Sequence, residues 1–131
     1  MIGLDTNILV RYLTQDDAAQ AALAAEIVER RITQDEPGFV SLVTVAELVW
    51  VLGSFYEFTG KEIATAVERL LQIDTLNIQN EREVFAAMVA VRTGLGSFDD
   101  ALIGALGEWA GCEATLTFDR KAARMKGFSL A

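Results

Sequence analysis

The sequence has no histidine, a single cysteine and a single proline among its 131 residues. The absence of histidine excludes imidazole-based zinc sites, histidine-dependent catalytic triads and histidine general bases. Any metal site must therefore be built from oxygen ligands. With Cys112 alone, no intrachain disulfide is possible, and a reducing compartment is favoured. The lone proline and the ten glycines leave little room for a low-complexity linker.

Long hydrophobic runs and an excess of positive charge are also missing. The longest apolar stretch, residues 39–52, is too short to span a membrane and is interrupted by Glu47. The first residues carry neither a basic region nor a small-residue cleavage site. We therefore expect a cytoplasmic protein that does not associate with membranes. The formal net charge is −8, which by itself counts against nucleic-acid binding.

What is present is a chain that is 52% hydrophobic and long enough to bury a core. Short apolar runs alternate along it with helical patterns. We predict strands at residues 2–4, 39–41, 75–78, 114–118 and 128–130. We predict helices that begin near residues 5, 17, 44, 59, 80, 97 and 119. No repeat or internal boundary is visible, so we expect a single domain over residues 1–131. The alternation predicts an α/β fold, with a parallel sheet, helices on both faces and a site beyond the carboxyl ends of the strands.

Two carboxylates stand where a predicted strand gives way to a predicted helix. Asp5 follows the first apolar run, and Asp119 follows the run at residues 114–118. Either residue could simply cap the helix that follows it, since aspartate does this well. The carboxyl end of a parallel strand is also where ligands bind, so both roles are compatible. Thr117 lies on the same side of its strand as Asp119 and is placed to form hydrogen bonds near it.

Glu47 stands in an apolar helical segment. Its neighbours on the same helix face are Val43, Thr44, Trp50 and Val51. The pattern predicts no solvated face for this carboxylate, and burial of an unpaired charge is costly. We therefore expect it to be protonated, bound to a metal or paired with an arginine in a buried salt bridge.

Asp100 lies in the first turn of a predicted helix that opens at Ser97. A capping box between these two residues is one interpretation. Asp100 also shares a helix face with Gly104 and Gly107, which lower helix stability by roughly 1 kcal/mol each. That cost indicates that another part of the backbone approaches closely on this side. Asp99 points elsewhere and is interpreted as a solvated capping residue.

Considered together, the four acids indicate a cation site. Three of them stand at sheet-edge or helix-start positions, and the fourth lies in an apolar helix. Four converging carboxylates repel each other unless cations are bound. A site with only oxygen ligands favours Mg²⁺ or Mn²⁺. Such an ion positions water, lowers its pKa and neutralises charge on a phosphodiester.

These residues resemble a known family. The segments 3–7, 41–48, 98–103 and 117–119 match PIN domains in order and spacing, and more closely the VapC-type toxins of bacterial toxin–antitoxin pairs. Any one segment is a weak motif, but the ordered set is specific and covers nearly the whole chain. The resemblance implies a three-layer α/β/α sandwich with a central parallel sheet of about five strands.

The resemblance also implies a function. It suggests Mg²⁺ or Mn²⁺ held mainly by Asp5 and Asp100, with Glu47 and Asp119 ligating directly or through water. Asn7 and Thr117 would be polar groups behind these ligands. The implied reaction is hydrolysis of RNA phosphodiester bonds by a metal-activated water, which makes the protein an endoribonuclease. The implied partners are a cognate VapB-type antitoxin and a second copy of the chain in a homodimer.

A local cluster of basic residues offers a positive surface although the net charge of the chain is negative. Four of the eleven basic residues fall within residues 120–126, next to Asp119. We interpret them as possible contacts to RNA phosphates, the alternative being an ordinary solvated helix face. The four are Arg120, Lys121, Arg124 and Lys126.

Other classes stay open. A nuclease with another role, in RNA processing or DNA cleavage, would use the same acids. A doubly wound signalling domain or phosphatase needs further acids beside the first, and Asp5 is followed by Thr6 and Asn7 instead. A non-catalytic binding module is the remaining alternative. Gly94-Leu95-Gly96 is no phosphate loop, because the Gly-Lys-Ser/Thr ending is absent.

Overall fold

The computed structural model describes all residues, Met1–Ala131, and divides into two compact units. Unit 1 comprises Met1–Glu57 and Arg69–Gln79, and unit 2 comprises Phe58–Glu68 and Asn80–Ala131. The helix α4 (Gly60–Leu71) contributes to both. That residues 1–131 form one domain stays a prediction.

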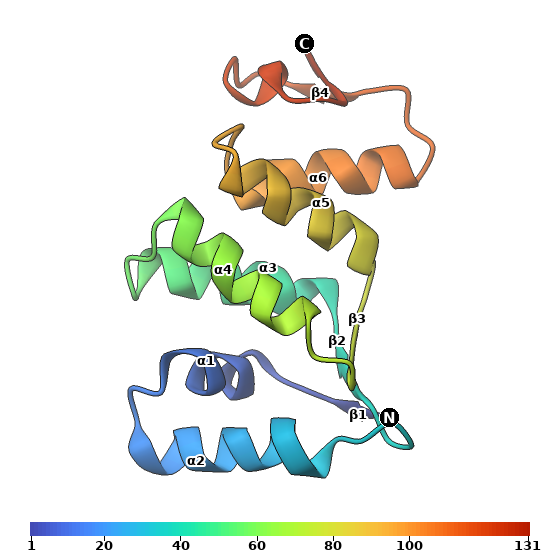
Figure 1. Ribbon diagram of the computed structural model, residues 1–131. Helices are drawn as coiled ribbons and strands as arrows, with labels where there is room; N and C mark the ends of the chain where they lie inside the picture. The colour runs from blue at the N-terminus through green and yellow to red at the C-terminus, as the bar shows by residue number, and fades with distance from the viewer. The chain divides into compact units, whose positions relative to one another are not determined.

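Unit 1 is built on a three-stranded parallel sheet in the order β1-β2-β3. Ile2 pairs with Gly38, which in turn pairs with Leu76, and the three strands run alongside each other in Figure 1. At Gly38 a Cβ atom would lie 2.9 Å from the Leu76 side chain, so a larger residue in the central strand would require Leu76 to shift. The elements are β1 (Ile2–Gly3), α1 (Thr6–Thr14), α2 (Ala18–Glu26), the π-helical turn η1 (Ile27–Arg31), β2 (Gly38–Val40), α3 (Leu42–Ser54) and β3 (Leu76–Ile78).

The helices of unit 1 begin where the sequence supplies a capping side chain. Asp17 accepts a hydrogen bond from the Gln20 N–H at 3.0 Å, and Ser41 accepts one from the Thr44 N–H at 3.1 Å. Such caps satisfy backbone donors that have no partner within the helix. The largest fully buried side chains of this unit come from three of its elements and are Leu9, Val40, Leu48 and Leu52.

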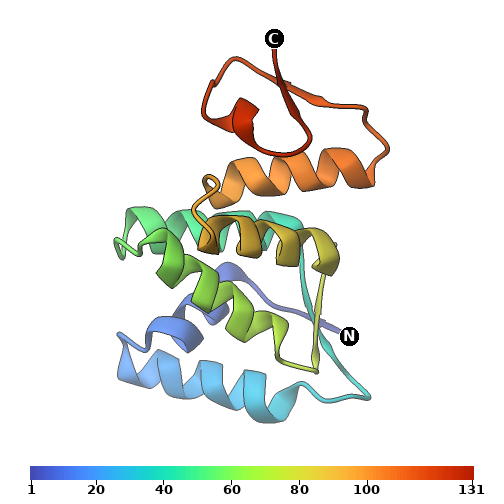
Figure 2. The ribbon, with the colours of Figure 1, turned by 45° about the horizontal axis from the view of Figure 1, so that its top comes forward.

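Unit 2 pairs two helices with two parallel strands. α5 packs along α6, and β4 pairs with β5 in the register Thr115↔Phe128 and Thr117↔Leu130. Both views show the last strand, at the red end of the chain, beside β4 (Figures 1 and 2). The elements are α5 (Glu81–Arg92), α6 (Phe98–Trp109), β4 (Thr115–Thr117), the 3₁₀ helix η2 (Ala122–Arg124) and β5 (Phe128–Leu130).

These elements confirm the predicted α/β class, with helices flanking parallel strands. All five predicted strands are present and all are parallel. The expectation of one sheet of about five strands is met only in part, because the structure has a sheet of three and a pair. No helix is both long and apolar enough to cross a membrane.

Candidate functional site

Asp5 lies two residues beyond the end of β1 and forms the N-cap of α1. Its Oδ1 accepts a hydrogen bond from the Thr6 N–H at 2.8 Å, and its side chain is exposed. The capping role expected from the sequence is therefore confirmed. Oδ2 has no hydrogen-bond partner, so the same carboxylate can also bind a ligand at the strand end.

Glu47 corrects one expectation from the sequence. It lies in α3, where its side chain is exposed and forms neither a salt bridge nor a hydrogen bond. Val43 and Trp50 on the same helix are also exposed, at 76% and 63%. The expectation that the Glu47 side chain is buried is therefore wrong. Val43 and Trp50 lie on the surface with Glu47, while Val45, Leu48 and Val49 supply the buried face.

Within unit 1, Asp5 and the start of α3 share one edge of the sheet. β1 and β2 are adjacent and parallel, so their carboxyl ends lie at the same edge. Asp5 follows β1, and Ser41, the N-cap of α3, follows β2. Glu47 stands six residues beyond Ser41, about 9 Å along the helix axis.

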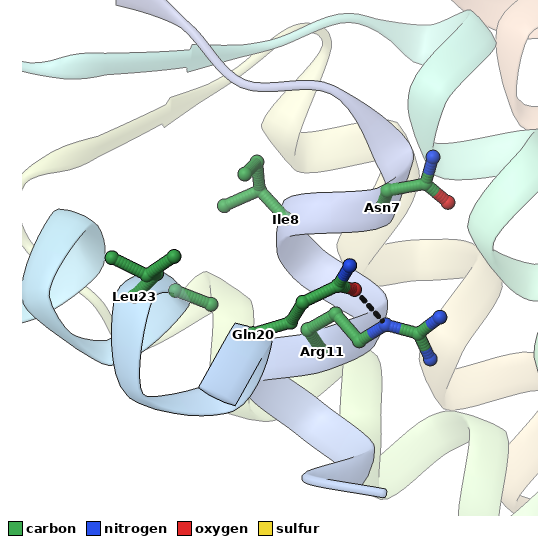
Figure 3. Close-up of a pocket in the computed structure, with 6 residues that line it drawn as sticks. Asn7, Ile8, Arg11, Gln20 and Leu23 are labelled. Carbon is green, nitrogen blue, oxygen red and sulfur yellow. Dashed lines mark hydrogen bonds between the residues drawn. The ribbon is translucent and has the colours of Figure 1, made fainter. Parts of the chain in front are cut away.

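A cavity of about 330 Å³ lies beside α1 and α2 of unit 1. Asn7, the predicted polar neighbour of the site, lines it together with Arg11 and Gln20 (Figure 3). Arg11 Nε donates to Gln20 Oε1 at 2.6 Å, the bond drawn as a dashed line in the figure. Leu23, from α2, is 65% exposed. The cavity thus offers two amides, one cation and an apolar wall.

The Arg11 side chain is fixed by a network that sequence reasoning missed. Arg11 Nη1 donates to Asp16 Oδ1 at 2.9 Å and to the Tyr56 hydroxyl at 3.1 Å. The Tyr56 hydroxyl in turn donates to Asp16 Oδ2 at 2.7 Å. This bond, with others from Thr14 and Arg11, holds the pKa of Asp16 below its usual value. Tyr56 lies 40 residues from Asp16, so no local pattern signals the contact.

Asp100 stands in the first turn of α6 in unit 2 and is half-buried. Its backbone N–H donates to the Ser97 Oγ at 3.2 Å, so Ser97 caps the helix as predicted. The Asp100 carboxylate does not complete a capping box, because it forms no hydrogen bond. That leaves both of its oxygens available for a ligand.

Asp119 follows β4 and is exposed. Its Oδ1 accepts hydrogen bonds from the backbone N–H of Lys121 at 2.8 Å and of Ala122 at 3.3 Å. Thr117 Oγ1 accepts one from the Asp119 N–H at 3.0 Å. The predicted hydrogen bonding of Thr117 near Asp119 is confirmed. The helix predicted to begin at Asp119 is not: only the short 3₁₀ helix η2 follows, with Lys121 as its N-cap and no side-chain cap, and Asp119 closes the turn before it. Oδ2 of Asp119 again remains without a partner.

Two close approaches fix the direction of β4 against α6. A Cβ atom at Gly107 would lie 2.6 Å from Thr115 Oγ1, and one at Gly96 would meet the Met125 sulfur. The C-terminal half of α6 therefore faces the start of β4. The segment that follows β4 reaches the N-terminal end of the helix.

This direction places Asp100 and Asp119 toward the same end of unit 2. Asp100 is in the first turn of α6, and Asp119 begins the segment that leads from β4 to η2. The expected approach of another part of the backbone to the glycine face of α6 is wrong. Side chains lie there instead, since a Cβ atom at Gly104 would lie 2.6 Å from the Phe128 ring and one at Gly107 would lie 2.6 Å from Thr115 Oγ1.

The four predicted acids are thus divided between the units. Asp5 and Glu47 belong to unit 1, and Asp100 and Asp119 belong to unit 2. No group of three or more potential ligands gathers within either unit. Each of the four keeps at least one carboxylate oxygen without a hydrogen-bond partner.

The sequence matches the PIN domain family over residues 2–127. The chain belongs to the PIN domain family. PIN domains are generally metal-dependent nucleases, and membership confirms the coarse part of the functional expectation. No curated protein matches the sequence.

The side chains of this PIN domain fit a hard divalent cation. The chain has no histidine, and its one cysteine is exposed beyond α6. The candidate ligands are four carboxylates with free oxygens, the ligand type that Mg²⁺ and Mn²⁺ prefer. The ligand set itself stays a prediction.

The basic segment of this PIN domain, residues 120–126, is free of ion pairs. Its four cations are exposed, and all three salt bridges of the protein lie elsewhere. The segment contains no acid and follows directly after Asp119. Its cations therefore remain available to an anionic partner.

Proposed function

We propose that this PIN domain is a metal-dependent endoribonuclease and the toxin of a VapC-type toxin–antitoxin pair. Membership of the family over residues 2–127 carries the proposal. It is supported by the four acids, each with a free carboxylate oxygen. The finer role, as a toxin that acts on RNA, rests on the resemblance of the sequence segments.

We assign the metal to Asp5 and Asp100, with Glu47 and Asp119 ligating directly or through water. When bound, Mg²⁺ or Mn²⁺ supplies a water of lowered pKa and neutralises charge on the phosphodiester. The chain's own groups orient the ligands. The Thr6 N–H fixes one oxygen of Asp5, and Thr117 accepts the backbone N–H of Asp119. Asn7 is assigned as a polar neighbour of the site.

Two partners complete the proposal. A cognate antitoxin would place an arginine or lysine near the four acids, because an acidic pocket attracts a basic side chain. A second copy of the chain would form a homodimer. Exposed apolar side chains such as Leu23, 65% exposed on α2, favour association, and light scattering at micromolar concentration tests it. A monomer would contradict the dimer without touching the nuclease.

Cleavage of labelled RNA with Mg²⁺ or Mn²⁺ tests the nuclease. Asp5→Asn and Asp100→Asn should each abolish cleavage, because an amide binds a hard cation poorly. Asp99→Asn is the matched control, since Asp99 is the exposed neighbour of Asp100, and it should retain activity. Undiminished cleavage in EDTA, or full activity in either site variant, would refute the mechanism. A parallel assay on DNA decides between the two substrates.

A further inference from the structure

Arg11, Asp16 and Tyr56 form a closed ring of hydrogen bonds, called the polar clamp below. Arg11 Nη1 donates to Asp16 Oδ1 at 2.9 Å and to the Tyr56 hydroxyl at 3.1 Å, and that hydroxyl donates to Asp16 Oδ2 at 2.7 Å. Each member is bonded to the other two, and both carboxylate oxygens of Asp16 are occupied. All three residues belong to unit 1, so the clamp lies within one compact unit.

The polar clamp connects two helices that are far apart in the sequence. Arg11 lies in the last turn of α1, and Asp16 stands in the short connection between α1 and α2. Tyr56 follows the end of α3, where its N–H donates to the Val51 carbonyl at 3.3 Å. The clamp therefore connects the carboxyl end of α1 to the carboxyl end of α3, and the Tyr56 hydroxyl supplies every bond to α3.

The other ends of the same two helices are held by the sheet. β1 and β2 pair in parallel, and α1 and α3 follow them, capped by Asp5 and Ser41. Between their ends, α1 packs against α3, and Leu9 and Leu48 are fully buried. Apolar packing is non-directional, whereas a hydrogen bond depends on distance and angle. The polar clamp thus adds directed contacts at the end where no strand pairing holds the helices.

Two candidate metal ligands lie on the helices that the polar clamp connects. Asp5 caps α1, and Glu47 lies in the second turn of α3. Neither carboxylate is held by an ion pair, so the distance between them follows the placement of their helices. A small hard cation such as Mg²⁺ demands near-ideal ligand geometry, and a misplacement of about 1 Å at an active site can cost 10²-fold in rate. The spacing of α1 and α3 therefore matters for the site.

We propose that Arg11, Asp16 and Tyr56 are positioning residues, which hold α1 against α3 and thereby set the separation of Asp5 and Glu47. They act through the helices and not as ligands. The inference rests on the proposed function, because it treats Asp5 and Glu47 as ligands. The ion pair of the clamp has side chains that are 30% and 42% exposed, and exposed pairs add little to the free energy of unfolding. Its loss should therefore alter geometry more than stability.

Mn²⁺ binding, measured by isothermal titration calorimetry on the full chain, tests the clamp without relying on cleavage. Tyr56→Phe removes one hydroxyl, and with it every bond of the clamp to α3, but keeps the ring. It should weaken Mn²⁺ binding about 10-fold, the lower end of the range for groups that orient metal ligands. At saturating Mn²⁺ it should lower kcat for RNA by a similar factor and leave KM unchanged, because the clamp does not touch the substrate.

A second substitution checks the route of the effect. Asp16→Asn alone keeps the Tyr56 hydroxyl in place and should weaken Mn²⁺ binding by a smaller factor than Tyr56→Phe. In a Tyr56→Phe background, Asp16→Asn should have no further effect on Mn²⁺ binding, because the connection to α3 is already lost. A further loss of affinity in the double variant would show that Asp16 acts by another route, and would overturn the clamp.

A matched control and a thermal melt separate positioning from stability. Glu26→Gln breaks the other ion pair of unit 1, between Arg30 and Glu26 at 3.6 Å, which joins residues one helical turn apart. It should leave Mn²⁺ binding unchanged. Tyr56→Phe should melt within roughly 4 °C of the wild type in EDTA. If it melts lower but binds Mn²⁺ as tightly as the wild type, the clamp serves stability alone and the proposal is overturned.

Cleavage by the wild type distinguishes this proposal from the nuclease. Mn²⁺ binding that is weakened by Tyr56→Phe, without cleavage of RNA or DNA by the wild type, would support the clamp and refute the nuclease. Cleavage and Mn²⁺ binding that are both unchanged in Tyr56→Phe would overturn the clamp and leave the nuclease standing. A wild type that binds no Mn²⁺ would also overturn the clamp.

Discussion

The two units differ in how charge accompanies their candidate acids. Unit 1 carries ten acidic and four basic residues, a net charge of −6, and its one cation beside the cavity, Arg11, is paired with Asp16. Unit 2 carries nine acidic and seven basic residues, a net charge of −2, and four of its cations follow Asp119 unpaired. The acidity of the whole chain therefore says little about either site. Of the four candidate acids, Asp119 is the one that is followed directly by a run of unpaired cations, and it lies in unit 2.

The largest expected effect tests whether the two units unfold together or separately. Leu48→Ala in unit 1 and Met88→Ala in unit 2 remove side chains that are 0% and 1% exposed. Each should cost about 2–5 kcal/mol, which lowers the melting temperature by roughly 6–20 °C in a chain of this size. If residues 1–131 form one domain, calorimetry will show a single transition that either variant shifts as a whole. Two transitions, each moved by only one variant, would contradict the single domain.

A smaller effect is expected where α6 meets the β4–β5 pair. Gly104→Ala would bring a Cβ atom to 2.6 Å from the Phe128 ring, and overpacking of this kind costs about 1–3 kcal/mol. Gly3→Ala in unit 1 is the matched control, because nothing lies within 4 Å of its added Cβ. Urea denaturation of both variants measures the difference. Equal midpoints would show that Phe128 moves aside without cost.

A third prediction concerns the acids themselves. If they converge to roughly 5 Å in the folded protein, two of the charges repel each other by about 3 kcal/mol at an effective dielectric near 20, which solvent and partial protonation reduce to about 1–2 kcal/mol. Asp100→Asn should then melt a few degrees above the wild type in EDTA, and Mn²⁺ should raise the wild type much more than the variant. The Ser97 cap is unaffected by this change, because it uses the backbone N–H of Asp100. A variant that melts lower in EDTA, with an equal shift by Mn²⁺ in both proteins, would limit Asp100 to a favourable charge at a helix start.

The smallest effect compares one exposed ion pair from each unit. The hydrogen bond from Tyr56 lowers the pKa of Asp16, and the hydrogen bond from Arg92 lowers the pKa of Glu68. The ordinary pKa values, which apply to the unfolded chain, are 3.8 for Asp16 and 4.5 for Glu68, and both are lower in the folded protein. Each ionised carboxylate therefore stabilises the fold above its ordinary pKa, and this contribution is lost as the pH falls through the lower pKa of the folded state. Asp16→Asn and Glu68→Gln should therefore each flatten the acid limb of the stability curve slightly. Melting temperatures between pH 2 and 6 measure this, and a wild-type slope in both variants would assign the acid sensitivity to other groups.

The sequence predicted most of what depends on neighbours along the chain. Each predicted strand exists, and the helix predicted to begin near residue 59 is present. Its start is a capping box, in which the Thr59 N–H donates to Glu62 Oε1 at 3.0 Å and the Glu62 N–H donates to Thr59 Oγ1 at 3.2 Å. Helix starts are local because one side chain satisfies a donor two or three residues away. The candidate acids Asp5 and Asp119 were found by the same signals.

What depends on distant contacts was predicted less well. Apolar neighbours around Glu47 indicated burial, yet the structure leaves Val43 and Trp50 on the surface with it. Hydrophobic residues are often exposed, so an apolar helix face does not by itself identify the core. The number of strands followed from the sequence, but their pairing did not, because pairing depends on which long-range contacts form.

The boundary between the units has a consequence for synthesis. Unit 1 needs residues 69–79 to supply β3, the partner of β2, but residues 58–68, which belong to unit 2, emerge from the ribosome before them. A nascent chain that has just reached Glu57 can therefore pair β1 with β2 but cannot close its sheet. Residues 1–79 contain all of unit 1 and residues 58–131 contain all of unit 2, so α4 belongs to both fragments. A single cut therefore leaves only one unit whole: a cut after Gln79 removes residues 58–68 from unit 2, and a cut after Glu57 removes residues 69–79 from unit 1.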